Sequence, residues 1–94
     1  MTTPVSITGS LALKADVVAR SAGDEMILLD LESGEYFTLN SVGAVIWKGL
    51  EAAMDLPALL SAVVEQFEVD EATAKSDIDE YIDSLISEGL VLRK

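Results

Sequence analysis

The chain contains neither cysteine nor histidine among its 94 residues. Without cysteine it can form no disulfide, no thiolate zinc site and no cysteine nucleophile. Without histidine it lacks the usual general base near neutral pH, the imidazole of the common catalytic triads and the commonest metal ligand. Most enzyme classes are therefore excluded, and we expect a protein that is not an enzyme and that holds no cofactor and no metal.

Basic residues are also scarce. Six Lys and Arg stand against 17 Asp and Glu, which gives a net charge of −11. The six are scattered along the chain instead of being set on one helix face, so no basic stripe offsets the charge that repels a phosphate backbone. The composition therefore argues against a nucleic-acid partner.

Long apolar runs are missing as well. No stretch approaches the roughly 18 consecutive apolar residues of a membrane span, and the N-terminus lacks the basic and apolar regions of a secretory signal. We therefore expect a cytoplasmic protein with no membrane partner. Half of the residues are nonetheless hydrophobic, enough for one compact core in a chain of this length. We predict one folded domain over residues 11–94, preceded by a flexible polar arm over residues 1–10.

The first part of this domain has the pattern of a β-meander. Residues 11–40 are rich in β-branched and aliphatic side chains and are interrupted by polar clusters at 21–24 and 32–35, which mark hairpin turns. The predicted strands are Leu11–Arg20, Glu25–Leu31 and Tyr36–Leu39. Apolar residues occupy both faces of the middle strand, which predicts a central strand covered on at least one side, with Asp30 near its end in reach of water.

The rest of the chain shows helical spacing in three segments, each preceded by a polar residue able to cap a helix. The predicted helices are Ser41–Ala52, a second from the cap Asp55 to about Phe67, and Glu71–Glu88. Gly89 is the expected terminator of the third helix. The fold class is therefore α+β, winged helix-turn-helix-like, with a three-stranded antiparallel sheet followed by three helices.

The third predicted helix carries the candidate residues for metal or acid–base chemistry. Its acidic residues are Asp77, Asp79, Glu80, Asp83 and Glu88. At about 100° per residue, three of them (Asp79, Glu80 and Asp83) lie opposite the apolar face, where a helix keeps its solvated charges. No calcium-loop spacing is present either. The pattern therefore favours a solvated face over a metal site.

The last strand of the meander, Glu35–Leu39, would leave one row of main-chain groups unpaired, and such an edge can accept another strand. The third helix has a wide apolar arc, and Tyr81 offers an apolar ring with a hydroxyl in reach of water. Both features suit a groove for a guest chain. They are equally compatible with ordinary sheet residues and a tyrosine at the edge of the core.

One set of residues, from the second turn to the first helix, resembles the signature of PqqD-like proteins. These residues are Leu29, Asp30, Ser33, Gly34, Tyr36, Phe37, Leu39, Asn40, Gly43, Ile46 and Trp47. The resemblance continues through the helical spacing of Asp77, Ile78, Leu85, Gly89 and Leu90. It covers roughly residues 17–91 and leaves the N-terminal arm outside.

The resemblance implies a RiPP recognition element, a small module that binds the leader region of a ribosomally made precursor peptide. In this family the leader adds as a strand to the third strand of the sheet, beside the third helix, and catalysis belongs to partner enzymes. The peptide-binding residues that the resemblance implies here are Glu35, Tyr36, Phe37, Thr38, Leu39, Asp77, Ile78, Tyr81 and Leu85.

The residues around the first predicted helix look closest to the versions found in lasso-peptide pathways. The implied partners are thus a precursor leader peptide and a processing enzyme, a leader peptidase or a cyclase. Quinone-cofactor and sactipeptide pathways remain open, as does the choice between a monomer and a strand-swapped dimer. With no other domain attached, the chain is expected to be of the stand-alone kind.

Two other function classes compete with this interpretation. A winged-helix DNA-binding regulator would share the topology, but the net charge of −11 disfavours it. A small enzyme that uses only carboxylates and hydroxyls would need residues such as Asp77 or Glu80 for turnover.

Overall fold

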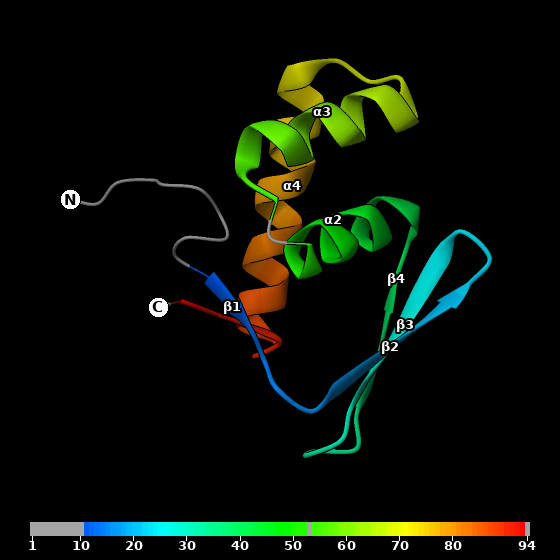
Figure 1. Cartoon of the computed structure of the whole chain (residues 1–94), viewed down its shortest axis with the longest axis vertical. Helices are drawn as coiled ribbons and strands as arrows, with labels where there is room; N and C mark the ends of the chain where they lie inside the picture. Colours follow the sequence, from blue (N-terminus) through cyan, green and yellow to red (C-terminus); the bar gives the residue numbers. More distant parts are fainter. Residues whose placement is uncertain (1–10, 53, 94) are drawn as a thin grey trace.

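The computed structural model describes residues 11–52 and 54–93, and the predicted arm, residues 1–10, lies outside them. The predicted α+β class is confirmed: a three-stranded antiparallel sheet is followed by three helices (Figure 1). The elements in chain order are β1 (Leu11–Leu13), β2 (Val17–Ala22), β3 (Glu25–Asp30), β4 (Tyr36–Leu39), α2 (Ser41–Glu51), α3 (Leu56–Phe67), α4 (Glu71–Ser87) and β5 (Val91–Arg93).

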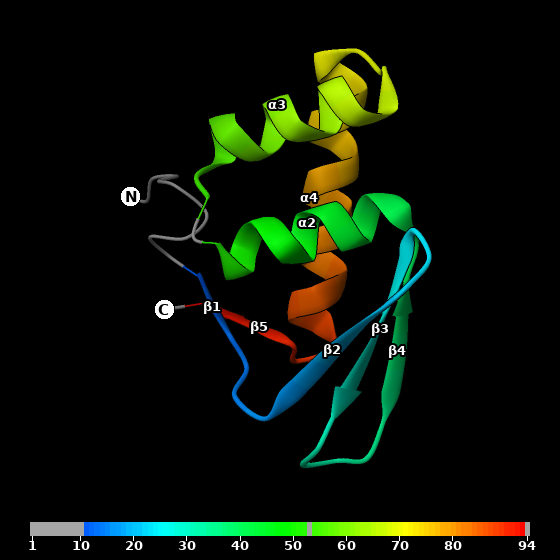
Figure 2. The same ribbon diagram turned by 45° about the vertical axis from the view of Figure 1, so that its right-hand side comes forward.

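The main sheet has the order β2-β3-β4, so β3 is central and β4 is an edge, as predicted. Helix α2 lies between this sheet and α3, and α4 passes across both helices (Figures 1 and 2). Helix α2 therefore covers one face of the sheet, and α3 and α4 pack on α2.

The predicted strand over residues 11–20 is wrong in one respect, because the chain bends after Leu13 and forms two strands instead of one. Asp16 takes the left-handed conformation, with φ of 63°, and its carbonyl accepts a hydrogen bond from the Leu31 amide at 2.9 Å. Strand β1 leaves the main sheet at this bend and pairs with β5, a strand that the sequence pattern did not predict. A further hydrogen bond, from the Lys14 amide to the Leu90 carbonyl at 2.9 Å, fixes the start of this second sheet.

The helices begin and end close to the predicted residues because their caps form as expected. The side chains of Asn40, Asp55 and Asp70 accept hydrogen bonds from the amides three residues later, at 2.9, 3.0 and 2.9 Å. Gly89 ends α4 with φ of 79°. The helices pack their apolar faces onto a core centred on Leu28, Ile46, Trp47, Leu59 and Ile78. None of the helices in the described part of the chain is long and apolar enough to cross a membrane.

The central strand β3 alternates as a strand with one buried face. Met26, Leu28 and Asp30 are buried, whereas Ile27 is exposed on the other face. The expectation that Asp30 reaches water is wrong, since this residue is only 4% exposed. Its Oδ2 accepts a hydrogen bond from Lys14 Nζ at 2.7 Å, and its Oδ1 accepts from the Glu32 amide at 3.0 Å. A buried carboxylate is tolerated here because a cation and main-chain donors replace the lost water.

This arrangement predicts how stability depends on pH. The hydrogen bond from Lys14, with help from the turn amides, holds the pKa of Asp30 below its ordinary value of 3.8, and the same contact raises the pKa of Lys14. The stabilisation by Asp30 is therefore complete above its unfolded pKa and is lost as the pH falls through its lower folded pKa. We expect Asp30→Asn to lower the urea midpoint at pH 7 and to flatten the loss of stability between about pH 5 and pH 2.

The measurement is urea unfolding followed by circular dichroism across this pH range. Asp79→Asn is the matched control, because Asp79 forms an exposed pair with Lys75 and should change little. Equal pH slopes for the wild type and Asp30→Asn would show that the buried pair does not control acid stability.

Candidate functional site

The open edge of β4 is defined by the register of the main sheet. Residues 36–39 pair with β3 from Leu29↔Tyr36 to Met26↔Leu39, and one step further the Asp30 amide donates to the Glu35 carbonyl at 3.0 Å. Hydrogen-bonded positions alternate along an antiparallel pair. Phe37 and Leu39 therefore direct their main-chain groups toward β3, while Tyr36 and Thr38 direct theirs toward the open edge.

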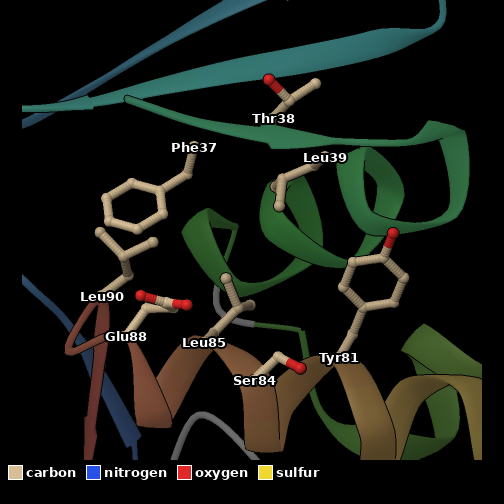
Figure 3. Close-up of a pocket in the computed structure, with 8 residues that line it drawn as sticks. All are labelled: Phe37, Thr38, Leu39, Tyr81, Ser84, Leu85, Glu88 and Leu90. Carbon is tan, nitrogen blue, oxygen red and sulfur yellow. The ribbon is translucent and has the colours of Figure 1, made fainter. Parts of the chain in front are cut away.

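A cleft of about 190 Å³ lies between this edge and α4. Figure 3 shows Phe37 and Leu39 pointing from β4 toward α4, whereas the side chain of Thr38 points away from the helix. The lining residues are Phe37, Thr38, Leu39, Tyr81, Ser84, Leu85, Glu88 and Leu90. Within the described residues no strand pairs with this edge of β4, which thus runs along a mainly apolar cleft large enough for individual side chains of a guest.

The C-terminal end of α4 shapes one end of the cleft. The Gly89 amide donates to the Ile86 carbonyl at 3.0 Å, and the Leu90 amide donates to the Leu85 carbonyl at 2.9 Å. This pair of hydrogen bonds is the Schellman motif, which brings the residue after the glycine against the last full turn of the helix. As a result Leu90 and Leu85 lie together in the cleft, and Glu88 occupies the C-cap beside them.

A close approach between α2 and α4 shapes the other end. A Cβ added at Gly43 would lie 2.6 Å from Tyr81 Cε1 and 3.0 Å from Leu39 Cβ, so a larger side chain has no room there. The missing side chain at Gly43 lets the Tyr81 ring rest on α2 next to Leu39. The position of this half-buried ring is therefore fixed by a glycine on another helix.

The structure brings some of the predicted site residues together and separates others. Phe37, Thr38, Leu39, Tyr81 and Leu85 line the cleft. The remaining four do not line it: Glu35 precedes β4 and is exposed, Tyr36 faces the other side of the sheet, Asp77 is half-buried on α4 one turn before Tyr81, and Ile78 is fully buried in the core.

Three residues of the cleft were missing from the predicted set. Ser84 and Glu88 follow Tyr81 at the spacings i+3 and i+7, so the helical period could have added them to the residues that the resemblance implied. Leu90 lies beyond the helix end, and its place depends on the Schellman turn.

Tyr36 belongs to a second surface, on the face of the sheet away from the helices. It is 71% exposed and lies beside Val18, Arg20, Ile27 and Leu29. Because the register places Val18, Leu29 and Tyr36 in one row across three strands, this surface is separate from the cleft. Tyr36 and Phe37 are thus neighbours in sequence that face opposite sides of the sheet.

Outside the cleft, their mutual contact displaces the pKa values of Lys14 and Asp30, and hydrogen bonds from Thr73 lower the pKa of Asp70. Asp79, Glu80 and Asp83 are exposed, as predicted for a solvated face. Within the described ranges no group of three or more acidic side chains is placed to hold a metal ion.

The contact between Gly43 and Tyr81 gives a structural prediction. We expect Gly43→Ala to displace the Tyr81 ring, because the new methyl group would overlap it, and to leave the Tyr36 ring unchanged. The chain has only these two tyrosines, so their ring signals can be followed separately by NMR. Gly49→Ala is the control in the same helix, since its Cβ would meet Leu59 at 2.6 Å and not the cleft. Wild-type Tyr81 signals in Gly43→Ala would refute this account.

Comparison with known proteins places this geometry in a family. Two solved structures are similar to the chain. One, described as "TbiB1 in Complex with the TbiA(beta) Leader Peptide", has 30% sequence identity and a TM-score of 0.77, over 84% of this chain and 92% of that one. The other, "Lasso peptide synthetase B1 complexed with the leader peptide", has 28% identity and a TM-score of 0.78, over 88% of this chain and 98% of that one.

None of the curated proteins compared with the chain matches it. The family model for coenzyme PQQ synthesis protein D, PqqD, matches residues 25–91, which hold the main-sheet strands β3 and β4, all three helices and both sides of the cleft. The resemblance seen in the sequence is therefore confirmed, and the chain belongs to the PqqD family.

Proposed function

We propose that this chain is a non-catalytic adaptor that binds the leader segment of a ribosomally made precursor peptide and presents the precursor to a processing enzyme. The observation that carries the proposal is the open edge of β4 beside the β4–α4 cleft. The two similar solved structures support it, because both are described as complexes with a leader peptide. We propose residues 11–94 as the recognition domain.

Strand addition explains how such a cleft can bind a peptide. Tyr36 and Thr38 direct their main-chain groups outward, so an extended guest can pair with them without disturbing the bonds to β3. Main-chain pairing supplies affinity for any extended chain, and the pockets met by alternate side chains select among guests. In this protein the selecting residues come from α4, chiefly Tyr81, Leu85 and Glu88.

The adaptor role is supported by what remains free when the leader is bound. A leader held at β4 leaves the downstream part of the precursor free, and tethering of this kind raises the effective concentration of that part at the active site of a bound enzyme. One similar structure is described as a lasso peptide synthetase component, so we place the chain in a lasso-peptide pathway, with a leader peptidase or a cyclase as the enzyme. Ribosomal precursors are made in the cytoplasm, where we place this step.

Binding of DNA has less support. The residues that line the cleft include no Lys or Arg, and the patch around Tyr36 on the outer face of the sheet includes one basic residue, Arg20. A winged-helix protein needs a basic surface to neutralise phosphates.

A proline in the edge strand tests strand addition directly. We expect Thr38→Pro to weaken leader binding by at least about tenfold, because it removes an outward amide donor and places a ring on the open edge. The fold should survive, since proline is tolerated on an edge strand where its missing amide faces solvent. The assay is fluorescence anisotropy with labelled leader peptides taken from short reading frames next to this gene, against a scrambled peptide.

Thr38→Val is the matched control, because it keeps the amide and the shape of the side chain and should bind like the wild type. Circular dichroism checks that both variants are folded. Wild-type affinity in a folded Thr38→Pro protein is the result that strand addition cannot accommodate.

The two tyrosines test which side of the sheet the leader occupies. Tyr81 lines the cleft and Tyr36 lies on the outer face, so Tyr81→Ala should weaken leader binding by about tenfold or more, as for a buried aromatic contact, while Tyr36→Ala should change it less than about twofold. The same anisotropy titration gives both dissociation constants. If Tyr36→Ala weakens binding more than Tyr81→Ala does, the leader binds to the outer face of the sheet and not to the cleft.

A further inference from the structure

One end of the β4–α4 cleft combines apolar walls with a carboxylate. Figure 3 shows Phe37, Leu90 and Glu88 together at this end, with Leu85 beside them and Tyr81 at the other end near Leu39. Among the residues that line the cleft, Glu88 alone is an acidic or basic residue. The end near Phe37 thus offers a guest side chain three apolar neighbours and one negative charge.

Glu88 has no ion-pair partner among the side chains that the structure describes, those of residues 12–52 and 54–92. Over these residues the ion pairs join Lys14 to Asp30 and Glu32, and Lys75 to Asp79. Glu88 is also the C-cap of α4, whose last turn contains no basic residue. The C-terminal end of a helix carries a partial negative charge, so a carboxylate is unfavourable there and a cation is favoured. Both the side chain and the helix end therefore attract a positive group to the same place.

The register of the edge shows which guest residues reach this end. If a guest pairs antiparallel to β4 through the outward groups of Tyr36 and Thr38, its residues opposite Phe37 and Leu39 turn their side chains toward α4. One guest residue lies between these two. The guest residue opposite Phe37 meets Phe37, Glu88 and Leu90, and the guest residue opposite Leu39 meets Leu39 and Tyr81.

We propose that the cleft selects a leader with Lys or Arg at the position opposite Phe37, with the charged head on the Glu88 carboxylate. The inference rests on the proposed function, since it takes strand addition as given. Long basic side chains fit this end because their alkyl stems cover apolar surface while the charged head stays in contact with water. An arginine head can in addition stack on the Phe37 ring. At the guest position opposite Leu39, the Tyr81 ring and the Leu39 side chain favour an apolar side chain.

The position of Glu88 gives a reason to assign it to binding and not to folding. Because a carboxylate at a helix C-terminus is unfavourable, Glu88→Gln should not lower the thermal midpoint of the free protein. A residue that stabilised the fold would show the opposite effect. The variant therefore remains folded and can be used in binding assays.

The experiment is a scan of the leader peptide that saturates the wild-type protein. Each position is replaced in turn by lysine, by norleucine, which keeps an alkyl stem without the charge, and by glutamate. Anisotropy titrations then compare the wild type, Glu88→Gln, Glu88→Lys and Glu80→Gln. Glu80 is exposed on α4 outside the cleft, so its variant loses the same charge at another place.

We expect one position at which lysine binds about three- to tenfold more tightly than norleucine in the wild type at low salt, in the range of a partly exposed ion pair. Glu88→Gln should remove this preference, Glu88→Lys should reverse it in favour of glutamate, and Glu80→Gln should leave it unchanged. High salt should reduce it.

The outcomes separate this inference from the proposed function. Saturable binding with no position that prefers lysine, or with a preference that survives Glu88→Gln, overturns the assignment of Glu88 and leaves the adaptor function in place. The absence of saturable binding by any leader peptide overturns the proposed function and this inference together.

Discussion

The buried carboxylate of Asp30 is the interaction on which the rest of the structure depends. Its two oxygens accept hydrogen bonds from Lys14, which lies in the bend between β1 and β2, and from the turn that follows β3. The Asp30 side chain therefore joins three parts of the chain: the bend that holds Lys14, the end of β3 and the turn that follows β3. The turn in particular sets the register of β4, because Gly34 donates to the Asp30 carbonyl at 2.7 Å and the strand starts two residues later. A shift of one residue would turn Phe37 and Leu39 to the outer face and Tyr36 and Thr38 toward the helices.

The cleft depends on two glycines for different physical reasons. Gly43 supplies space, since any side chain there would occupy the volume of the Tyr81 ring. Gly89 supplies a left-handed conformation, with φ of 79°, that folds Leu90 back against Leu85. Gly43 thus places the Tyr81 ring at one end of the cleft, and Gly89 places Leu90 at the opposite end, beside Phe37 and Glu88. The main-chain groups of the β4 edge can bind any extended peptide. The contact of Gly43 with Tyr81 and the contact of Leu90 with Leu85 make the two ends of the cleft different.

Local patterns predicted most of the fold. The helix caps, the terminator Gly89 and the order of strands follow from short-range chemistry, which a sequence displays directly. The bend at Lys14–Asp16 and strand β5 were not predicted, because β1 and β5 are stabilised by pairing across almost the whole chain and each is only three residues long. Asp30 was placed near water because its partner Lys14 lies 16 residues earlier. Within the predicted site, Ile78 likewise depends on contacts that are distant in sequence. Its helical spacing groups it with Tyr81 and Leu85, but tertiary packing buries it in the core.

The overall charge and the charge at Glu88 act over different distances. A net charge of −11 attracts a basic peptide during its approach, but at physiological ionic strength exposed charges are largely screened beyond about 8 Å. Most of the 17 acidic residues therefore affect how fast a guest arrives and cannot tell one guest register from another. The main-chain groups of β4 cannot do so either, because they repeat along every extended peptide. Discrimination between registers must come from groups in contact with the guest. In the cleft between β4 and α4, the Tyr81 ring at one end and the Glu88 carboxylate at the other are the side chains that differ enough to supply it.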